Sequence, residues 1–339
     1  MKIAVDAFGG DNAPLEIIKG AAAAVEEYGA EVVLVGDSET IKKCAEDNNI
    51  DISKLEIEHA DGVFDMHDTP TDILKSKRKT SMGVAFDLVA DGKADAFVSA
   101  GSTGAVVAGA TFIIKRNQVI KRPALGTVLP GRNKRFMLMD VGANAECRPE
   151  MLRQFGIMAS LYLQNVEGVE NPEIALLNIG TEDTKGGSLQ LEAYKLLSES
   201  PINFIGNVEA RDLPIGVCDA AIADGFTGNV ALKLYEGVAM NLMTMIKGVF
   251  SSNFKTKMAY LLVKSKVRGL KKFMDYGDVG GAPLLGVKKP VIKAHGSSDA
   301  RALKNAIRQA LLCAENDVTG KISADMERLS AEEGESIAE

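Results

Sequence analysis

Several hydrophobic runs of this sequence end in glycine-rich turns that carry hydroxyl, amide or acidic side chains. In the turn Gly101–Gly104, two hydroxyl residues, Ser102 and Thr103, stand between two glycines. Glycine lets a bound anion approach bare backbone N–H groups, and the N-terminus of a following helix attracts negative charge. For any one turn, a tight bend with a capping hydroxyl is the alternative. Their recurrence predicts a site for phosphate-like charge formed by Gly10, Asp11, Gly101, Ser102, Thr103, Gly104, Asp140, Asn144, Asp224 and Thr227.

Three polar side chains near these turns are candidates for catalysis. Lys185 precedes a pair of glycines, where a flexible cation can reach into a crevice, although a solvated loop lysine is the commoner case. Asn229 closes one of the turns, where its amide can donate to an oxyanion or simply cap the next helix. His295 follows a short predicted strand and can donate a proton or contact an anion, or serve as a structural histidine.

The remaining reactive side chains have no suitable partners in sequence. Cys147 has no adjacent histidine, so we expect an inert thiol. The four cysteines are scattered with no CxxC pair, which favours a reducing cytosol and argues against a zinc site. His59 and His67 also lack metal-ligand partners at suitable spacing. We therefore predict no metal and no cofactor. For Asp140, the alternative to substrate binding is a structural role in which it holds a neighbouring loop.

The composition is that of an ordinary globular protein. Of its 339 residues, 46% are hydrophobic and 25% are charged, which is enough to form a core without disulfides or metals. The net charge of −7 argues against nucleic acid as a partner. No apolar run reaches about 18 residues, so no membrane span is expected. The first residues enter a strand directly, which predicts no signal peptide.

Strands and helices alternate along most of the chain, and this alternation predicts an α/β fold with a mostly parallel sheet between helices. Helices are expected from Pro14, from a serine cap at Ser38 and over Val230–Phe250. Ligands bind beyond the carboxyl ends of parallel strands, so we expect the polar turns to form one crevice. The sequence predicts one catalytic domain over residues 1–325 and an acidic, disordered tail over 326–339.

Residues 250–276 differ from the rest of the chain because they carry seven basic side chains and one acidic one. The apolar positions change helical face near Val263–Ser265, which predicts two short amphipathic helices that meet there. One interpretation of this basic arm is a helical pair whose apolar stripes are buried in a dimer or in the core. The other is a surface arm that meets the acidic carrier protein or an anionic membrane, the membrane through Leu261, Leu262, Lys264, Lys266 and Val267.

Taken together, the turns resemble those of the bacterial phosphate acyltransferases of phospholipid synthesis. The resemblance covers about residues 1–315 and rests on six motifs in order: Gly9–Pro14, Ser99–Ala105, Asp140–Asn144, Gly206–Glu209, Asp224–Asn229 and His295–Arg301. Two departures occur. Phe8 stands where that family has methionine, and the loop from Gly180 to Gly187 is looser than usual but retains Lys185.

This resemblance implies a Rossmann-like α/β/α sandwich related to phosphotransacetylase and to isocitrate-type dehydrogenases. It implies transfer of an acyl group from acyl carrier protein to inorganic phosphate, and it points to Lys185 and Asn229. It further implies a cytoplasmic homodimer that meets the inner membrane face peripherally and supplies a membrane glycerol-3-phosphate acyltransferase.

The residues fit this chemistry independently, because a phosphate oxygen can attack a thioester without a protein nucleophile. The protein then has to hold both substrates and stabilise the oxyanion. Three other functions compete with this one. They are a phosphotransacetylase-like enzyme that uses acyl-coenzyme A, a metal- and nicotinamide-dependent decarboxylating dehydrogenase, and a non-catalytic module that binds lipid or carrier protein.

Overall fold

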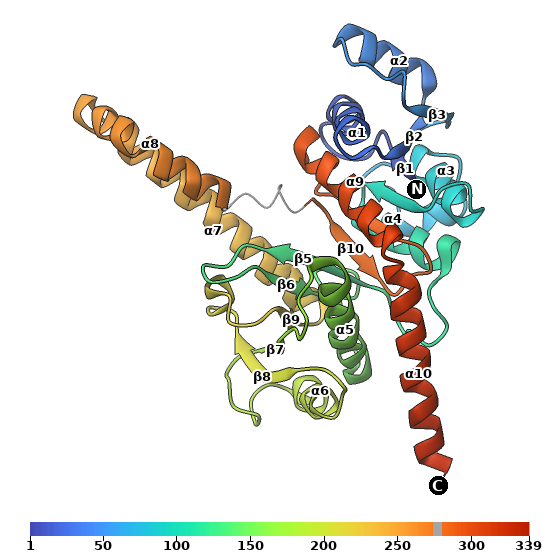
Figure 1. Ribbon diagram of the computed structural model, residues 1–339, viewed down its shortest axis with the longest axis vertical. Helices are drawn as coiled ribbons and strands as arrows, with labels where there is room; N and C mark the ends of the chain where they lie inside the picture. Colours follow the sequence, from blue (N-terminus) through green and yellow to red (C-terminus); the bar gives the residue numbers. More distant parts are fainter. Residues whose placement is uncertain (274–279, 339) are drawn as a thin grey trace.

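In the computed structural model, which describes residues 1–273 and 280–338, the chain folds around one sheet of 11 strands (Figure 1). One half is parallel and contains β3 (Glu56–His59), β2 (Glu31–Gly36), β1 (Lys2–Asp6), β4 (Ala96–Ser99) and β11 (Val291–Lys293), in that order. The other half is parallel as well and contains β6 (Phe136–Met139), β9 (Ala220–Ile222), β7 (Ile174–Asn178) and β8 (Phe204–Glu209).

Two central strands, β10 (Ala282–Leu285) and β5 (Ala124–Leu129), join the halves. The pairs β11–β10, β10–β5 and β5–β6 are all antiparallel. Three successive antiparallel pairs lie between β11 and β6, so the strands of one parallel half run in the opposite direction to those of the other. The sheet is therefore mostly parallel, as predicted, with an antiparallel seam at its centre.

Each face of the sheet has its own hydrophobic core. Ile3 and Val5 belong to one core and Ala4 to the other, because successive side chains of a strand point to opposite faces. Burial on both faces explains why the strands read as continuous apolar runs. The first core contains side chains of α1 (Leu15–Tyr28), α2 (Ser38–Asp47), α5 (Pro149–Tyr162), α6 (Ser188–Ser198), α9 (Ala300–Glu315) and α10 (Val318–Ala338).

The second core contains side chains of α3 (Ser81–Ala90) and α4 (Thr103–Gly109). The predicted α/β/α sandwich is thus confirmed. Short helical turns complete it: η1 (Pro70–Leu74), η2 (Ala110–Lys115), η3 (Leu163–Glu167) and η4 (Leu213–Ile215).

One helix cap differs from the prediction. The predicted Ser38 cap is wrong, because α2 begins at Ser38 and the Asp37 carboxylate before it accepts the Thr40 N–H at 2.8 Å. Asp299 caps α9 in the same way, and its carboxylate accepts the Ala302 N–H at 2.8 Å. In both cases an aspartate directly before the helix satisfies a first-turn N–H group.

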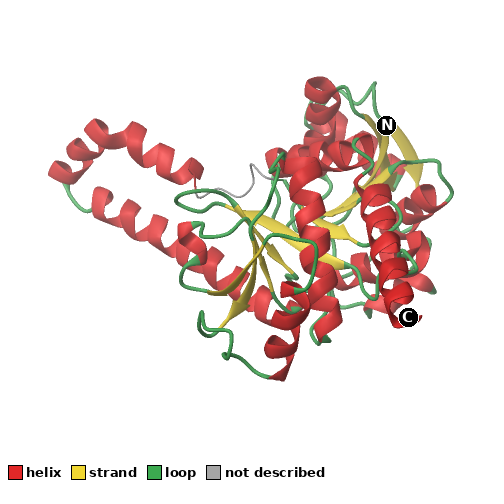
Figure 2. Cartoon of the chain, turned by 60° about the horizontal axis from the view of Figure 1, so that its bottom comes forward, coloured by secondary structure: helices red, strands yellow, loops and turns green. Residues whose placement is uncertain are grey.

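The basic arm begins in the last residues of α7 (Gly225–Ser251) and continues as α8 (Phe254–Phe273). The two long helices form a hairpin that extends away from the sheet (Figures 1 and 2). The predicted break near Val263–Ser265 is wrong, because α8 continues through it. The chain turns at 252–253 instead, where the Asn253 side chain accepts the Thr256 N–H at 3.0 Å. Residues 274–276 of the predicted arm lie outside the described residues.

The predicted disordered tail also differs from the structure, in which α10 continues to Ala338. Met326 is buried in the core, and Glu327 accepts a hydrogen bond from Asn117 at 3.3 Å. These contacts attach the beginning of the predicted tail to the body of the protein. Glu339 lies outside the described residues.

Candidate active site

A cavity of about 580 Å³ lies where turns from both halves of the sheet meet. The carboxyl ends of β1, β4 and β11 line it with Gly10, Asp11, Gly101, Ser102, Thr103, Lys293 and His295. From the other half, Val141 after β6 and Asn229 on α7 line the same cavity. Segments far apart in sequence thus form one space, in which polar groups stand beside the apolar side chains of Phe8, Val63, Phe64, Met66 and Leu232.

Glycines allow the turn after β1 to pack directly on its neighbours. A Cβ on Gly9 would stand 2.6 Å from Asp6 Oδ2 and 2.7 Å from the Gly101 nitrogen. Gly10 has a φ of +97°, and a Cβ there would stand 2.8 Å from the Gly296 carbonyl oxygen. A larger residue at either position would separate the turns that line the cavity.

A buried carboxylate supports the Gly101 turn from behind. Asp6 accepts hydrogen bonds from Ser81 Oγ at 2.6 Å and from Ser99 Oγ at 2.7 Å. Ser99 Oγ in turn accepts the Gly101 N–H at 2.9 Å. Burial raises the pKa of Asp6, whereas the serine hydrogen bonds and the charge of Lys293 act in the opposite direction. Asp6 was not among the residues that the sequence predicted for the site.

Lys293, which sequence reasoning missed, places a cation in the cavity wall. Its side chain lines the cavity although the residue is only 8% exposed. The ammonium donates to the carbonyl oxygens of Ala100, at 3.3 Å, and Ala294. Burial lowers the pKa of Lys293 to about 8, against the opposing charges of Asp6 and Asp11. The only sequence signal was a lysine at the end of an apolar strand.

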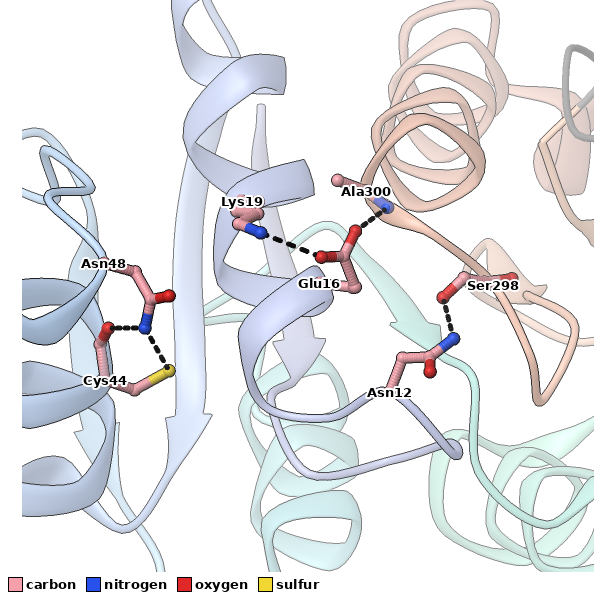
Figure 3. A network of polar contacts seen from close by, with 7 residues as sticks. All are labelled: Asn12, Glu16, Lys19, Cys44, Asn48, Ser298 and Ala300. Atoms are coloured by element: carbon pink, nitrogen blue, oxygen red, sulfur yellow. Dashed lines mark hydrogen bonds and ion pairs between the residues drawn. The ribbon is translucent and has the colours of Figure 1, made fainter.

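Hydrogen bonds fix the segment after β11 against the N-terminal turn (Figure 3). Asn12 donates from its amide to the Ser298 carbonyl at 3.2 Å, and Glu16 accepts the Ala300 N–H at 2.9 Å. The backbone N–H of Asp11 donates to the Gly296 carbonyl at 2.8 Å. These bonds hold the two cavity-lining turns in a fixed relation.

His295 lines the cavity as expected from its position after β11. Its Nδ1 accepts the Ser297 N–H at 3.2 Å and lies 2.9 Å from Ser297 Oγ. An accepting Nδ1 places the proton of a neutral imidazole on Nε2. Glu236, on α7, lines the same cavity, and burial raises its pKa while the charge of His295 lowers it.

Asn229 lies in the first turns of α7 and does not cap the helix. Asp224 is the cap, because its carboxylate accepts Thr227 N–H at 2.8 Å and Thr227 Oγ1 at 2.7 Å. A Cβ on Gly142 would stand 3.5 Å from Asn229 Cγ, an ordinary contact distance, so the turn after β6 packs beside this amide. With the capping role taken, the Asn229 side chain is left to face the cavity.

Several predicted substrate-binding residues instead brace the turns. Asp140 is fully buried and accepts four backbone N–H groups as well as the Asn144 amide. Among the described residues that line the cavity, Asp140, Asn144, Asp224, Thr227 and Gly104 do not appear. A Cβ on Gly104 would stand 2.7 Å from Pro70, which identifies this glycine as a packing position.

Lys185 lies in the loop after β7 and, in the described part of the chain, is not among the residues that line the cavity. Its side chain is 48% exposed, and Nζ lies 3.9 Å from a Glu182 carboxylate oxygen. The Asn178 amide donates to the Lys185 carbonyl at 3.1 Å and anchors the loop at the strand end. The exposed ion pair contributes little, so the side chain can adopt other orientations.

Cys147 is partly buried in the segment before α5. Burial raises the pKa of Cys147 to about 12, so its thiol stays protonated near neutral pH. Within residues 1–273 and 280–338, no group of three or more His, Cys, Asp or Glu side chains is placed to hold a metal ion. No helix in those ranges has the length and apolarity needed to cross a membrane.

The fold belongs to the class of the phosphotransacetylases. A phosphotransacetylase from Streptococcus pyogenes superposes with a TM-score of 0.64 at 18% identity, covering 92% of this chain and 94% of that one. A branched-chain phosphotransacylase from Enterococcus faecalis gives 0.52 at 15% identity, covering 92% and 98%. A putative 4-hydroxythreonine-4-phosphate dehydrogenase from Salmonella typhimurium gives 0.51 at 12% identity, covering 92% and 98%. The predicted similarity of fold to the phosphotransacetylases is confirmed, and a dehydrogenase shares this fold as well.

Comparison of sequences identifies the family. Residues 1–321 match the family model described as "Fatty acid synthesis protein". A phosphate acyltransferase from Acetivibrio thermocellus is 45% identical, with 98% of each chain covered. One from Geobacillus thermodenitrificans is 46% identical, covering 97% of this chain and all of the relative. The chain therefore belongs to the phosphate acyltransferase family, as its turns predicted.

Proposed function

We propose that this protein transfers a long-chain acyl group from acyl carrier protein to inorganic phosphate. The acyl phosphate then serves a membrane glycerol-3-phosphate acyltransferase in phospholipid synthesis. The observation that carries this proposal is the cavity itself, which combines anion-binding turns with an apolar wall in a member of this family. Its polar groups suit phosphate, and its apolar side chains suit the acyl chain.

In the proposed reaction, a phosphate oxygen attacks the thioester carbonyl carbon and forms the new C–O bond. The C–S bond breaks, and the carrier thiolate leaves with the electron pair. Because the phosphate is the nucleophile, the protonated Cys147 thiol has no role in bond formation. A thiolate with a pKa around 8.5 leaves readily and needs little help from an acid.

The side chains of the site have distinct tasks in this proposal. Backbone N–H groups at the start of α4, with Ser102 and Thr103, hold phosphate oxygens. Asn229 and His295 Nε2 donate to the oxyanion that develops on the carbonyl. Lys185 approaches from its exposed loop once both substrates are bound. No such approach is needed for the residues already in the cavity wall.

The hairpin of α7 and α8 is proposed to mediate association with a second copy of the chain and with a membrane. Along α7, exposed apolar side chains recur every three or four residues: Phe226, Val230, Leu234, Val238, Leu242, Met245 and Val249. This stripe suits a second copy of the chain, giving the expected homodimer. On α8, Leu262 is 87% exposed and lies near Lys264 and Lys266, which suits an anionic membrane surface. Peripheral attachment at the cytoplasmic membrane face follows from this proposal.

A comparison of acyl donors tests the proposed substrate. Purified protein is incubated with phosphate and either palmitoyl-acyl carrier protein or palmitoyl-coenzyme A, and acyl phosphate is measured by mass spectrometry. We expect the carrier-protein thioester to be used with the higher kcat/KM. Preference for coenzyme A would favour a phosphotransacetylase-like role, and nicotinamide reduction with hydroxy-acid substrates would favour a dehydrogenase.

A further inference from the structure

Lys293 is a buried cation that the proposed reaction has not yet used. It stands at the end of β11, where the residue lines the cavity and its ammonium reaches the Ala100 carbonyl, next to the Gly101 turn. Within the described residues, its ammonium donates to two carbonyl oxygens, those of Ala100 and Ala294. An ammonium has three protons, so one donor remains for a ligand in the cavity.

We propose that Lys293 is the phosphate-binding cation of this site and that Asp6, behind it, keeps the cation and the Gly101 turn in place. The inference rests on the proposed function, in which phosphate is the acceptor. A buried charge is retained in a protein only where something compensates it. Asp6 supplies part of that compensation, and a bound dianion would supply the rest.

The other charges around the cavity indicate where phosphate would lie. Asp11, Asp65 and Glu236 line the cavity and would repel a dianion, although burial raises the pKa of Glu236. Lys233 is on the exposed surface of α7 and His295 is exposed after β11. Lys293 is the cation that adjoins the glycine turns. We therefore place phosphate beside Lys293 and these turns. A charge-assisted hydrogen bond is stronger here than in water, because the lysine is shielded from solvent.

This placement predicts a dependence of phosphate binding on pH. Burial lowers the pKa of Lys293 to about 8, so the side chain loses its charge as pH rises through that value. Phosphate itself is already dianionic there, with a second pKa near 6–7. Phosphate affinity should therefore fall above pH 8, and binding should be accompanied by proton uptake because the bound dianion favours the charged amine.

The test compares Lys293→Met and Lys293→Arg with the wild type. Lys289→Met is the matched control, because Lys289 precedes the same strand and lines a different cavity. Phosphate binding is measured by isothermal titration calorimetry, and KM for phosphate and kcat are measured with acyl carrier thioester. We expect Lys293→Met to weaken phosphate binding and raise KM by roughly 10- to 100-fold, with a smaller effect on kcat. Lys293→Arg should restore much of the affinity, and Lys289→Met should behave as wild type.

A wild-type measurement keeps the inference testable if Lys293→Met does not fold. Calorimetry in two buffers of different ionisation enthalpy, between about pH 7.5 and 9.5, reports proton uptake on phosphate binding. A phosphate affinity that is constant over this range without proton uptake would overturn the inference, as would an unchanged KM in a folded Lys293→Met. Because binding is measured without acyl donor, a wild type that binds phosphate but makes no acyl phosphate would refute the proposed function alone.

Discussion

The two halves of the sheet contribute to the cavity in different ways. In the β1–β4–β11 half, three turns pack directly on one another, and the buried residues Asp6, Ser99 and Lys293 fix them. In the β6–β9–β7 half, buried aspartates brace the turns, while the side chains offered for chemistry are Asn229 on a helix and Lys185 on an exposed loop. In the proposed function, the first half is the fixed receptor for phosphate, and the second half supplies the groups that meet the acyl donor.

Removing the two side chains of the second half gives the largest expected effect. Asn229→Ala and Lys185→Ala should each lower kcat by about a hundredfold or more, the scale of losing one oxyanion contact. Steady-state rates of acyl phosphate formation test this, with circular dichroism to show that the fold is intact. Near-normal activity of both variants would remove the chemical role assigned to this half. A full effect of Lys185→Ala would show that the exposed loop reaches the cavity during turnover.

Enlarging a glycine should damage the first half through packing. In Gly9→Ala, the new methyl group would stand 2.6 Å from Asp6 Oδ2 and 2.7 Å from the Gly101 nitrogen, so backbone must move. We expect a loss of about 1–3 kcal/mol in the free energy of unfolding, together with weaker phosphate binding. Gly237→Ala is the control, because a Cβ there meets nothing within 4 Å and alanine favours the helix. Equal stability of Gly9→Ala and wild type would contradict the fixed packing of these turns.

Sequence patterns predicted the first half better than the second. Apolar runs that end in polar turns gave the strands, the sandwich and the cavity residues from Gly10 to His295. They could not show that β5 and β10 reverse the strand direction, because an apolar run carries no information about direction. Nor could they separate Asp140 or Asp224, which accept local N–H groups, from residues that face a ligand. Lys293 was missed because a lysine at a strand end usually reaches solvent.

The proposed membrane contact of the arm can be tested separately from the chemistry of both halves. Leu261→Glu/Val267→Glu should abolish low-salt binding to vesicles that contain anionic lipid, since each basic group near such a surface contributes about 1 kcal/mol and apolar insertion adds to it. Co-sedimentation at low and high salt measures this. Lys42→Gln/Lys43→Gln, on the exposed side of α2, changes net charge equally and should bind as wild type. Equal binding of the glutamate variant, or no binding by wild type, would assign the arm to dimer packing or carrier docking.

The smallest effect is expected at Cys147. Cys147→Ser should retain turnover within about twofold, because burial keeps the thiol protonated and phosphate supplies the nucleophile. Activity assays and intact-protein mass spectrometry during turnover measure this. An acyl group trapped on Cys147 would replace direct transfer with a covalent route.

Attack by a phosphate oxygen on the acyl carbon is the central claim, and isotope labelling tests it most directly. Protein is incubated with long-chain acyl carrier thioester and phosphate labelled at every oxygen with oxygen-18, and the acyl phosphate is analysed by mass spectrometry. Attack by phosphate predicts a product that retains all the labelled oxygens, including the one that bridges to the acyl carbon. An acyl phosphate whose bridging oxygen is unlabelled, or release of free fatty acid alone, would contradict the account.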